Sequence, residues 1–311
     1  METDFSHQPV LLNEVLEALN VKQNGIYVDA TFGRGGHSGA ILSRLGREGR
    51  LIAFDQDPEA IAYGRERFAD DSRIEFEHCN FSEMGSVIVK RGLGNRIDGV
   101  LMDLGVSSPQ LDDAGRGFSF LKLGPLDMRM NTEQGESAMQ WLARVDLRDL
   151  ILVLKRYGEE KFARRIATAI VETRKEQVID NTAMLASIIS DAIPVKEKHK
   201  HPATRSFQAI RMYINQELPS IESGLQAAAS MLAVGGRLAV ISFHSLEDRM
   251  VKRFMRDISS RAKLPPGLPI MEKDEDPPFR LVGKSWIASA DELAANPRSR
   301  SARLRVLERV R

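Results

Sequence analysis

The feature that most constrains the fold is an alternation of short apolar runs and helical segments over the first hundred residues. The apolar runs cover residues 26–30, 51–55 and 97–103, and residues 74–78 form a third run in which apolar and polar side chains alternate. Segments with helical spacing separate them, and Pro58 begins one of these helices at a position where its missing N–H costs little. Apolar strands separated by helices indicate a parallel sheet covered on both faces. The sequence therefore predicts an α/β domain with a doubly wound, Rossmann-like sheet.

The alternation stops after the fourth apolar run. Residues 105–130 are rich in Gly, Ser, Pro and Asp without a sustained period, and they predict a long loop of the kind that often carries function. Residues 138–192 show apolar residues at helical spacing until Pro194 ends the pattern. A glycine turn and an apolar run at 232–243 resume the strand pattern, and residues 303–310 are expected to form the last strand.

This order of segments predicts a domain that is interrupted and then completed. We expect residues 1–112 and 209–311 to form one discontinuous α/β domain. Residues 113–208 are expected to form an inserted helical domain together with its linking loop. With 311 residues, of which 42% are hydrophobic, the chain is long enough for two cores.

Composition excludes several other classes of protein. The single cysteine, Cys79, excludes an internal disulfide and a thiolate zinc site, and no metal is expected. Residues 1–9 contain acids and no apolar core, so they do not read as a signal peptide. No apolar run approaches the ~18 residues that span a bilayer. We therefore expect a cytoplasmic protein without membrane association.

The net charge of +1 conceals an uneven distribution. Residues 1–115 contain 11 Lys/Arg and 19 Asp/Glu, so they carry a net charge of −8, and the remainder carries +9. Such asymmetry is typical of a chain with a nucleic-acid-facing surface, although solvated helix faces give the same pattern.

A glycine cluster between the first apolar run and the next helix marks a nucleotide-type site. Backbone N–H groups at such a turn approach a ligand closely, and Asp55 follows Gly35 by 20 residues, the spacing at which a carboxylate meets ribose hydroxyls. The dinucleotide fingerprint fails because Ser38 stands where the third glycine is required. An NAD-dependent oxidoreductase is therefore disfavoured, and a phosphate-binding P-loop is absent.

S-adenosylmethionine fits these residues better, because it has no pyrophosphate and ends in a carboxylate and an ammonium. The backbone N–H groups of Gly35, Gly36 and His37 suit the carboxylate. Asp29 is expected to support the turn or to accept from the ammonium, and Asp103 lies at the same carboxyl edge. Phe81, after the third run, is a candidate for stacking on adenine. An RNA-binding scaffold that only senses a nucleoside remains the non-enzymatic alternative.

Seven sequence blocks resemble the bacterial 16S rRNA (cytosine-N4)-methyltransferases of the MraW family. The blocks are His7–Leu12, Asp29–His37, Asp103–Asp112, Arg116–Phe120, Gly124–Arg129, His201–Arg205 and Ser242–Asp248. The resemblance implies a class I S-adenosylmethionine-dependent methyltransferase whose helical insertion recognises the substrate. It implies methylation of N4 of a decoding-centre cytidine in 16S rRNA, within the small ribosomal subunit, with S-adenosylhomocysteine as product. A homodimer is left open.

By the same resemblance, seven positions bind the cofactor. They are Gly35, Gly36, His37, Asp55, Phe81, Asp103 and Gln110. The prolines and aromatic residue that follow the fourth strand in many amino-methyltransferases are absent here. Asp103 is thus the first candidate for the catalytic acceptor, with Ser107 and Ser108 as positioning groups; a role of Asp103 in cofactor binding alone stays open. His244 is expected either to line the substrate pocket or to make a structural hydrogen bond.

Aromatic and basic residues of the later part are candidates for RNA contact. Phe118 and Phe120, flanked by Arg116 and Arg129, have the composition that stacks on splayed bases, or else they anchor the loop in a core. The basic positions expected near phosphates are Lys155, Arg156, Arg164, Arg165, Lys196, Lys198, Lys200, Arg205, Arg249, Lys252, Arg253, Arg256, Arg298, Arg300, Arg303, Arg305, Arg309 and Arg311.

Overall fold

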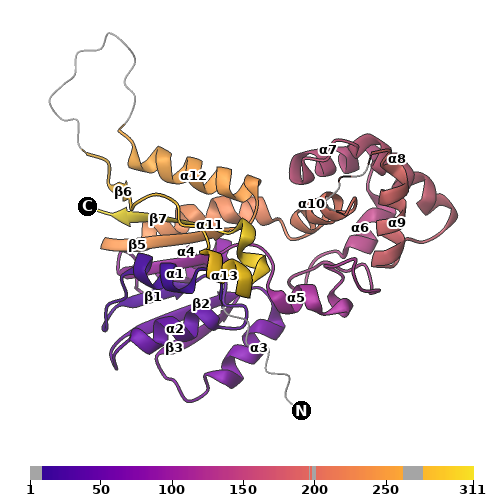
Figure 1. Ribbon diagram of the computed structural model, residues 1–311. Coiled ribbons are helices and arrows are strands. Elements are labelled where there is room, and N and C mark those ends of the chain that lie inside the picture. Colours follow the sequence, from indigo (N-terminus) through magenta and orange to yellow (C-terminus); the bar gives the residue numbers. More distant parts are fainter. Residues whose placement is uncertain (1–8, 196, 198–200, 262–275) are drawn as a thin grey trace, which may run out of the picture. The chain divides into compact units, whose positions relative to one another are not determined.

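The computed structural model describes residues 9–195, 197, 201–261 and 276–311. The chain divides into two compact units (Figure 1). One contains Met1–Gly105 and Pro219–Arg311 and is called the sheet unit here; the other contains Val106–Leu218 and is called the helical unit. The arrangement of an interrupted domain and an insertion is thus present in the structure.

The sheet unit is built on a seven-stranded sheet, counted over the described residues, with the strand order β3-β2-β1-β4-β5-β7-β6. The strands are β1 Ile26–Asp29, β2 Arg50–Asp55, β3 Ile74–His78, β4 Ile97–Asp103, β5 Leu232–Ser242, β6 Phe279–Leu281 and β7 Arg303–Arg309. The pairs from β3 to β5 are parallel, and β7 runs antiparallel to both β5 and β6. The predicted doubly wound α/β sheet is confirmed.

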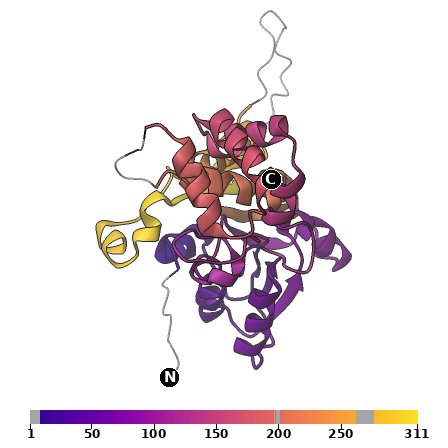
Figure 2. The same ribbon diagram turned by 90° about the vertical axis from the view of Figure 1, so that its right-hand side faces the viewer.

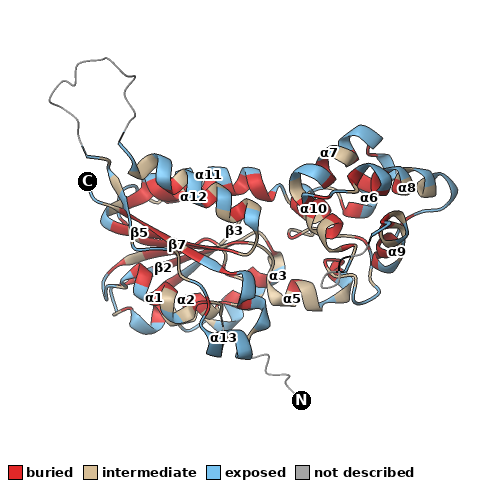
Figure 3. Ribbon diagram, turned by 45° about the horizontal axis from the view of Figure 1, so that its top comes forward, coloured by how far each residue is buried: buried red, intermediate tan, exposed pale blue. Residues whose placement is uncertain are grey.

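Helices cover both faces of this sheet, because its strands are apolar on both sides. The helices of the sheet unit are α1 Leu12–Leu19, α2 Gly36–Arg44, α3 Pro58–Arg67, η1 Phe81–Glu83, α4 Met84–Lys90, α11 Glu217–Met231, α12 Ser245–Ser259, α13 Ala290–Ala295 and η3 Pro297–Ser301. Figure 3 shows the buried strands between α11 and α12 on one side and α1 and α2 on the other. Tyr27, Leu51 and Leu101 pack with α1 and α2 in one core cluster.

The beginning of the described chain contacts late segments of the sheet unit. Figures 1 and 2 both show the C-terminal helical segment beside α1. The backbone N–H of Leu11 donates to Glu292 Oε1 at 2.7 Å, and Arg237 on β5 donates to the carbonyl of Ala18 at 2.9 Å. The beginning of the chain is therefore held by residues that are more than 200 positions away.

The helical unit has its own apolar core. Its helices are α5 Ser108–Asp112, η2 Ala114–Arg116, α6 Ala138–Arg144, α7 Leu147–Gly158, α8 Ala163–Glu176, α9 Thr182–Ala192 and α10 Thr204–Ile214. Gly158 lets α7 and α10 approach closely, because a Cβ at this position would lie 2.7 Å from the carbonyl oxygen of Arg205. Trp141 and Tyr213 add a ring contact at 4.6 Å between centroids.

Two details differ from the sequence expectation. Residues 105–130 are not one loop: Ser107 and Gln110 form a capping box that begins α5, a signal too short for periodicity to detect. The helical unit also extends beyond the expected insertion, residues 113–208, at both ends. Its C-terminal extension follows from packing, since Ala209 and Ile210 on α10 belong to the helical core.

No helix within the described ranges is long and apolar enough to cross a membrane.

Candidate cofactor and active site

Three carboxylates stand at the carboxyl edge of the sheet. Asp29, Asp55 and Asp103 are the last residues of β1, β2 and β4, and β1 pairs in parallel with both of the other strands. Parallel strands end on the same edge, so their terminal side chains gather there, where ligands of open α/β sheets bind. The structure thus brings together three acids that are far apart in the sequence.

The glycine turn between β1 and α2 is tied to the second of these acids. The N–H of Gly33 donates to Asp55 Oδ2 at 2.7 Å, and the N–H of Asp57 donates to Asp55 Oδ1 at 2.9 Å. Gly35 has φ +70°, and a Cβ there would lie 2.6 Å from the ring of Phe32. Both the backbone conformation and the lack of space therefore require glycine at position 35.

The first described residues of the chain close over the same turn. A Cβ on Gly36 would lie 2.4 Å from Pro9 Cγ, and His37 Nε2 lies 3.0 Å from the carbonyl oxygen of Val10. Gly36 begins α2. The backbone N–H groups in the first turn of this helix have no partner within the helix. The predicted block His7–Leu12 starts with two residues outside the described ranges, but its later residues support the turn.

Asp29 supports the glycine turn through two hydrogen bonds. Its side chain is 1% exposed; Oδ1 accepts from the N–H of Thr31 at 3.1 Å and Oδ2 accepts from Ser38 Oγ at 2.7 Å. Of the two roles expected for Asp29, this geometry favours support of the loop. Ser38, the residue that breaks the dinucleotide fingerprint, is the partner that makes the burial of Asp29 possible.

Asp103 has an oxygen available for a ligand. Its backbone N–H donates to Thr31 Oγ1 at 2.7 Å, and Oδ2 lies 3.7 Å from His37 Nδ1. Oδ1 is buried and has no hydrogen-bond partner among the described residues. An unpartnered acceptor beside two further carboxylates fits a cationic ligand such as the ammonium and sulfonium of S-adenosylmethionine.

Burial sets the protonation of these groups. It raises the pKa of Asp29 to about 6 and that of Asp55 to about 6. Burial also raises the pKa of Asp103 well above its usual range, with further contributions from the negative charges of Asp29 and Glu247. Burial lowers the pKa of His37 to about 4, so its ring is neutral near pH 7.

Phe81 follows β3 in the short helix η1 and is partly exposed. Its ring fills the space beside Gly224 of α11: a Cβ at Gly224 would lie 2.7 Å from Phe81 and 3.0 Å from the Met102 methyl group. Asp55 and His78 are paired at the carboxyl ends of β2 and β3. Phe81, three residues after His78, therefore follows the same edge of the sheet.

Glu247 is a buried acid that sequence reasoning missed. It is 0% exposed and accepts at Oε2 from the N–H groups of Phe243 and His244, at 2.8 and 3.2 Å. His244 is the N-cap of α12 and forms a capping box with Glu247. Of the two expectations for His244, the structural one is thus met. The capping residue is a histidine rather than Ser or Thr, so the usual motif gives no warning of it.

The remaining predicted site residues belong to the helical unit. Ser107 precedes α5, Ser108 begins it, and the N–H of Ser107 donates to Gln110 Oε1 at 3.0 Å. Gln110 is buried. Within this unit the structure brings Ser107 and Gln110 into contact.

The aromatic residues expected to stack on bases act as anchors instead. Phe118 is 6% exposed, and Phe120 stacks on His201 at 4.5 Å between ring centroids. Arg116 is buried and donates to the carbonyls of Arg129 and Met130. Of the two expectations for Phe118 and Phe120, the structure favours loop anchoring, because each ring already has partners within the protein.

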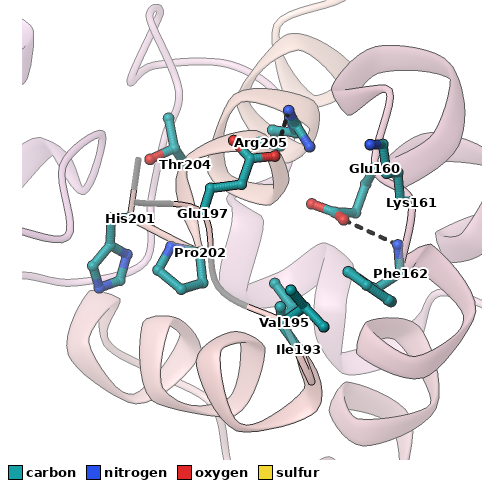
Figure 4. Close-up of a pocket in the computed structure, with 10 residues that line it drawn as sticks. All are labelled: Glu160, Lys161, Phe162, Ile193, Val195, Glu197, His201, Pro202, Thr204 and Arg205. Carbon is teal, nitrogen blue, oxygen red and sulfur yellow. Dashed lines mark hydrogen bonds and ion pairs between the residues drawn. The ribbon is translucent and has the colours of Figure 1, made fainter. Parts of the chain in front are cut away.

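The helical unit also contains a pocket (Figure 4). In its lining, Glu160 Oε1 accepts from the N–H of Phe162 at 3.0 Å, and Arg205 pairs with Glu197 at 2.9 Å. None of the predicted cofactor residues lines it.

Many of the predicted basic positions are exposed. On α12, Arg249, Lys252, Arg253 and Arg256 are exposed, as are Lys155, Arg156, Arg164 and Arg165 in the helical unit. Two tail residues are engaged: Arg305 pairs with Asp248 at 2.7 Å, and Arg309 donates to Asn95 and to the carbonyl of Leu232. Lys196, Lys198 and Lys200 lie outside the described residues.

A doubly wound sheet with a glycine turn and three carboxylates at its carboxyl edge, interrupted by a helical insertion, is the architecture of a class I S-adenosylmethionine-dependent methyltransferase. The sequence profile of the MraW methylase family matches residues 4–310. The chain therefore belongs to the MraW methylase family and is an S-adenosylmethionine-dependent methyltransferase, as predicted.

Close relatives cover almost the whole chain. It is 58% identical over 306 residues to the ribosomal RNA small subunit methyltransferase H of Thioalkalivibrio sulfidiphilus, covering 98% of each chain. It is 59% identical over 309 residues to the protein of the same name from Alteromonas mediterranea, covering 99% of this chain and 98% of that one.

Solved structures are more distant. An rRNA methylase from Streptococcus thermophilus is 14% identical with a TM-score of 0.40, covering 96% of this chain and 94% of that one. An S-adenosylmethionine-dependent O-methyltransferase from Thermotoga maritima is 9% identical with a TM-score of 0.38, covering 96% and 64%. At these scores the two structures add nothing to the assignment, which rests on the family match and the sequence relatives.

Proposed function

We propose that this methyltransferase acts in the cytoplasm on 16S rRNA within the small ribosomal subunit, and that it methylates the exocyclic N4 amine of a decoding-centre cytidine. Relatives 58 and 59% identical over nearly the full length carry the name ribosomal RNA small subunit methyltransferase H. The observation that carries the amine chemistry is Asp103, a carboxylate with an unpartnered oxygen at the end of β4.

The predicted cofactor residues would hold S-adenosylmethionine, which supplies an electrophilic methyl group on a sulfonium. The backbone N–H groups of Gly36 and His37, in the first turn of α2, are assigned to its carboxylate. Gly35 is the N-cap, and its own N–H donates to the Phe32 carbonyl, so it is assigned the close approach of the backbone to the cofactor. Asp55 is assigned to the ribose hydroxyls and Phe81 to the adenine face. Asp103 is assigned to the ammonium side and Gln110, from the helical unit, to the remaining polar contacts.

Asp103 is also the proposed acceptor for an N4 proton. The cytosine amine is a poor nucleophile because its lone pair is delocalised into the ring. A carboxylate that accepts one N4–H localises this pair, and it takes the proton when the amine gains its bond to the methyl carbon and the carbon–sulfur bond breaks. Ser107 and Ser108 are proposed to position the base.

The target base must leave its stack to reach such a site. The helical unit is proposed as the part that recognises the RNA. The exposed basic residues on its helices α7 and α8, and those on α12 of the sheet unit, are proposed as phosphate contacts.

Labelled-methyl transfer followed by nucleoside mass analysis tests the proposal. Free 16S rRNA and purified small subunits lacking the modification are incubated with the enzyme and methyl-labelled S-adenosylmethionine. We expect the label in N4-methylcytidine from a single decoding-centre position. Label in ribose, at C5 or in another base would refute the N4 assignment, and binding of NAD but not of S-adenosylhomocysteine in calorimetry would refute the cofactor.

The role of Asp103 is tested in the same assay with Asp103→Asn. We expect a loss of transfer of at least about 100-fold, the scale of a missing general base, while S-adenosylhomocysteine still binds. Asp98→Asn is a matched control on the opposite end of the same strand, where the carboxylate pairs with Lys22 and accepts from Ile26 N–H. Retained transfer in Asp103→Asn would leave this residue only a binding role.

A further inference from the structure

The ring of His37 has a fixed tautomer that the proposed function does not use. Its Nε2 lies 3.0 Å from the carbonyl oxygen of Val10. A carbonyl only accepts hydrogen bonds, so Nε2 must carry the hydrogen. The ring is neutral, because burial lowers its pKa to about 4. Nδ1 is therefore an unprotonated acceptor.

This acceptor faces a second one. His37 Nδ1 lies 3.7 Å from Asp103 Oδ2 at the carboxyl edge of the sheet. The His37 side chain is 7% exposed and that of Asp103 is 25% exposed, while Asp103 Oδ1 is buried. A bare nitrogen and an ionised carboxylate at this distance repel each other. A proton on Asp103 removes the repulsion, and a small rotation of the carboxyl group brings the pair into hydrogen-bond range.

We propose that His37 is a positioning residue for Asp103. In the ligand-free protein the Asp103 carboxyl group is protonated and donates a hydrogen bond to His37 Nδ1, which holds the other carboxyl oxygen toward the ligand. Asp103 gives up this proton when a cationic nucleoside binds beside it. After methyl transfer the sulfur is neutral, and Asp103 regains a proton, taken from the N4 amine. The last step rests on the proposed function; the proton exchange on binding does not.

Several titratable groups surround the pair. Asp29 on β1, Glu247 on α12 and His37 on α2 face Asp103. His244, the N-cap of α12, contacts Glu247, and Asp55 lies beyond Asp29. The two negative neighbours, Asp29 and Glu247, favour the protonated form of Asp103. Asp29 and Asp55 have pKa values of about 6, so they are largely ionised above pH 7. Proton exchange measured between pH 7 and 9 therefore separates Asp103 from these two.

Calorimetry in buffers of different ionisation enthalpy measures the protons released on binding. The chain is titrated with S-adenosylmethionine and with S-adenosylhomocysteine, whose sulfur is neutral, at several pH values between 7 and 9. We expect more proton release with the cationic ligand. Asp103→Asn should abolish the difference between the two ligands.

Two substitutions of His37 separate its two nitrogens. In His37→Gln the amide nitrogen keeps a donor for the Val10 carbonyl but nothing replaces Nδ1. We expect the proton-release curve to move down by at least about one pH unit, a tenfold loss of proton affinity at Asp103. In His37→Asn an amide oxygen takes the place of Nδ1. The proton-release curve should then move by less than about half of the shift in His37→Gln.

His78→Gln is the matched control, since the His78 ring lies 3.2 Å from the carbonyl of Gln56; its curve should follow the wild type. Equal curves for His37→Gln and wild type would overturn the proposal, as would equal proton release with both ligands in the wild type. Should His37→Gln fail to fold, the ¹⁵N shifts of the His37 ring in wild type decide: a protonated Nδ1 in the ligand-free protein refutes the proposal. None of these measurements needs RNA, so failure of the N4 assignment leaves them unaffected.

Discussion

At the scale of single residues, the site is built from acids that destabilise the fold. Asp29 is 1% exposed, and burial raises its pKa to about 6 against an ordinary value of 3.8. A raised carboxyl pKa means that the folded protein binds the proton more tightly than the unfolded chain. The contribution of Asp29 to stability is therefore complete below about pH 4 and is lost as the pH rises through about 6.

Asp29→Asn should remove this pH dependence. The amide does not ionise, so the free energy of unfolding of the variant relative to wild type should rise by up to about 3 kcal/mol between pH 4 and pH 8. Urea unfolding followed by the fluorescence of Trp286, in a Trp141→Phe background, reports on the sheet unit. Asp98→Asn is the control: it breaks an ion pair with Lys22 and should lower stability at pH 8. If the difference in the free energy of unfolding between Asp29→Asn and wild type did not change with pH, ionisation of the buried Asp29 would not destabilise the fold.

Single residues also mark how far the sequence alone reaches. The spacing from Gly35 to Asp55 predicts a carboxylate for ribose hydroxyls. It did not predict that Asp55 also holds the glycine turn, through the N–H of Gly33. The link between Ser38 and Asp29 was not predicted, because a hydrogen bond between nearby side chains depends on how the turn folds back. The tautomer of His37 depends on Val10, 27 positions earlier, and no local pattern reveals it.

At the scale of helices and strands, the sequence pattern predicts β1, β2 and β4 well because most of their residues are buried. The three-residue strand β6 is largely exposed and was not predicted. The pattern also fails where short polar signals begin an element, as at α5, and where packing decides to which unit a helix belongs. Phe207, Ala209 and Ile210 of α10 face the core of the helical unit. Their spacing in the sequence fits a helix of either unit equally well.

Helix α12 provides a test of the proposed RNA surface. Arg249, Lys252 and Arg253 are exposed on it. Replacing all three by glutamine should weaken binding of a 16S rRNA fragment. It should also reduce the slope of log affinity against log salt concentration by about 2, because each phosphate that a cation neutralises contributes ~0.7 to this slope. Filter binding at several salt concentrations measures the slope.

A control for net charge comes from the acidic part of the chain. Arg47→Gln, Arg65→Gln and Lys90→Gln remove three exposed cations from the sheet unit. This control variant should keep the wild-type slope. Equal slopes for the α12 variant and the control would remove α12 from the RNA surface.

At the scale of the whole molecule, two separate cores allow the units to respond differently to a ligand. Most assigned cofactor residues lie in the sheet unit, and each unit has one tryptophan, Trp286 and Trp141. S-adenosylhomocysteine at about 100 times its Kd should stabilise the sheet unit by about 2.7 kcal/mol.

Single-tryptophan variants read the two units separately. In Trp141→Phe, the urea midpoint of the Trp286 signal should rise with S-adenosylhomocysteine. In Trp286→Phe, the midpoint of the Trp141 signal should move much less. Equal shifts of both signals would mean that the two units unfold as one cooperative block.

The contacts between the first described residues and late segments of the sheet unit also bear on how the protein is made. Leu11 and Ala18 are held by Glu292 and Arg237, and β5 and β7 close the sheet. A ribosome delivers those partners last, after the whole helical unit has emerged. The insertion can therefore collapse on its own core while the cofactor turn, closed by Pro9 and Val10, must wait for release of the finished chain. In the nascent state this enzyme has its helical unit before it has a place for its methyl donor.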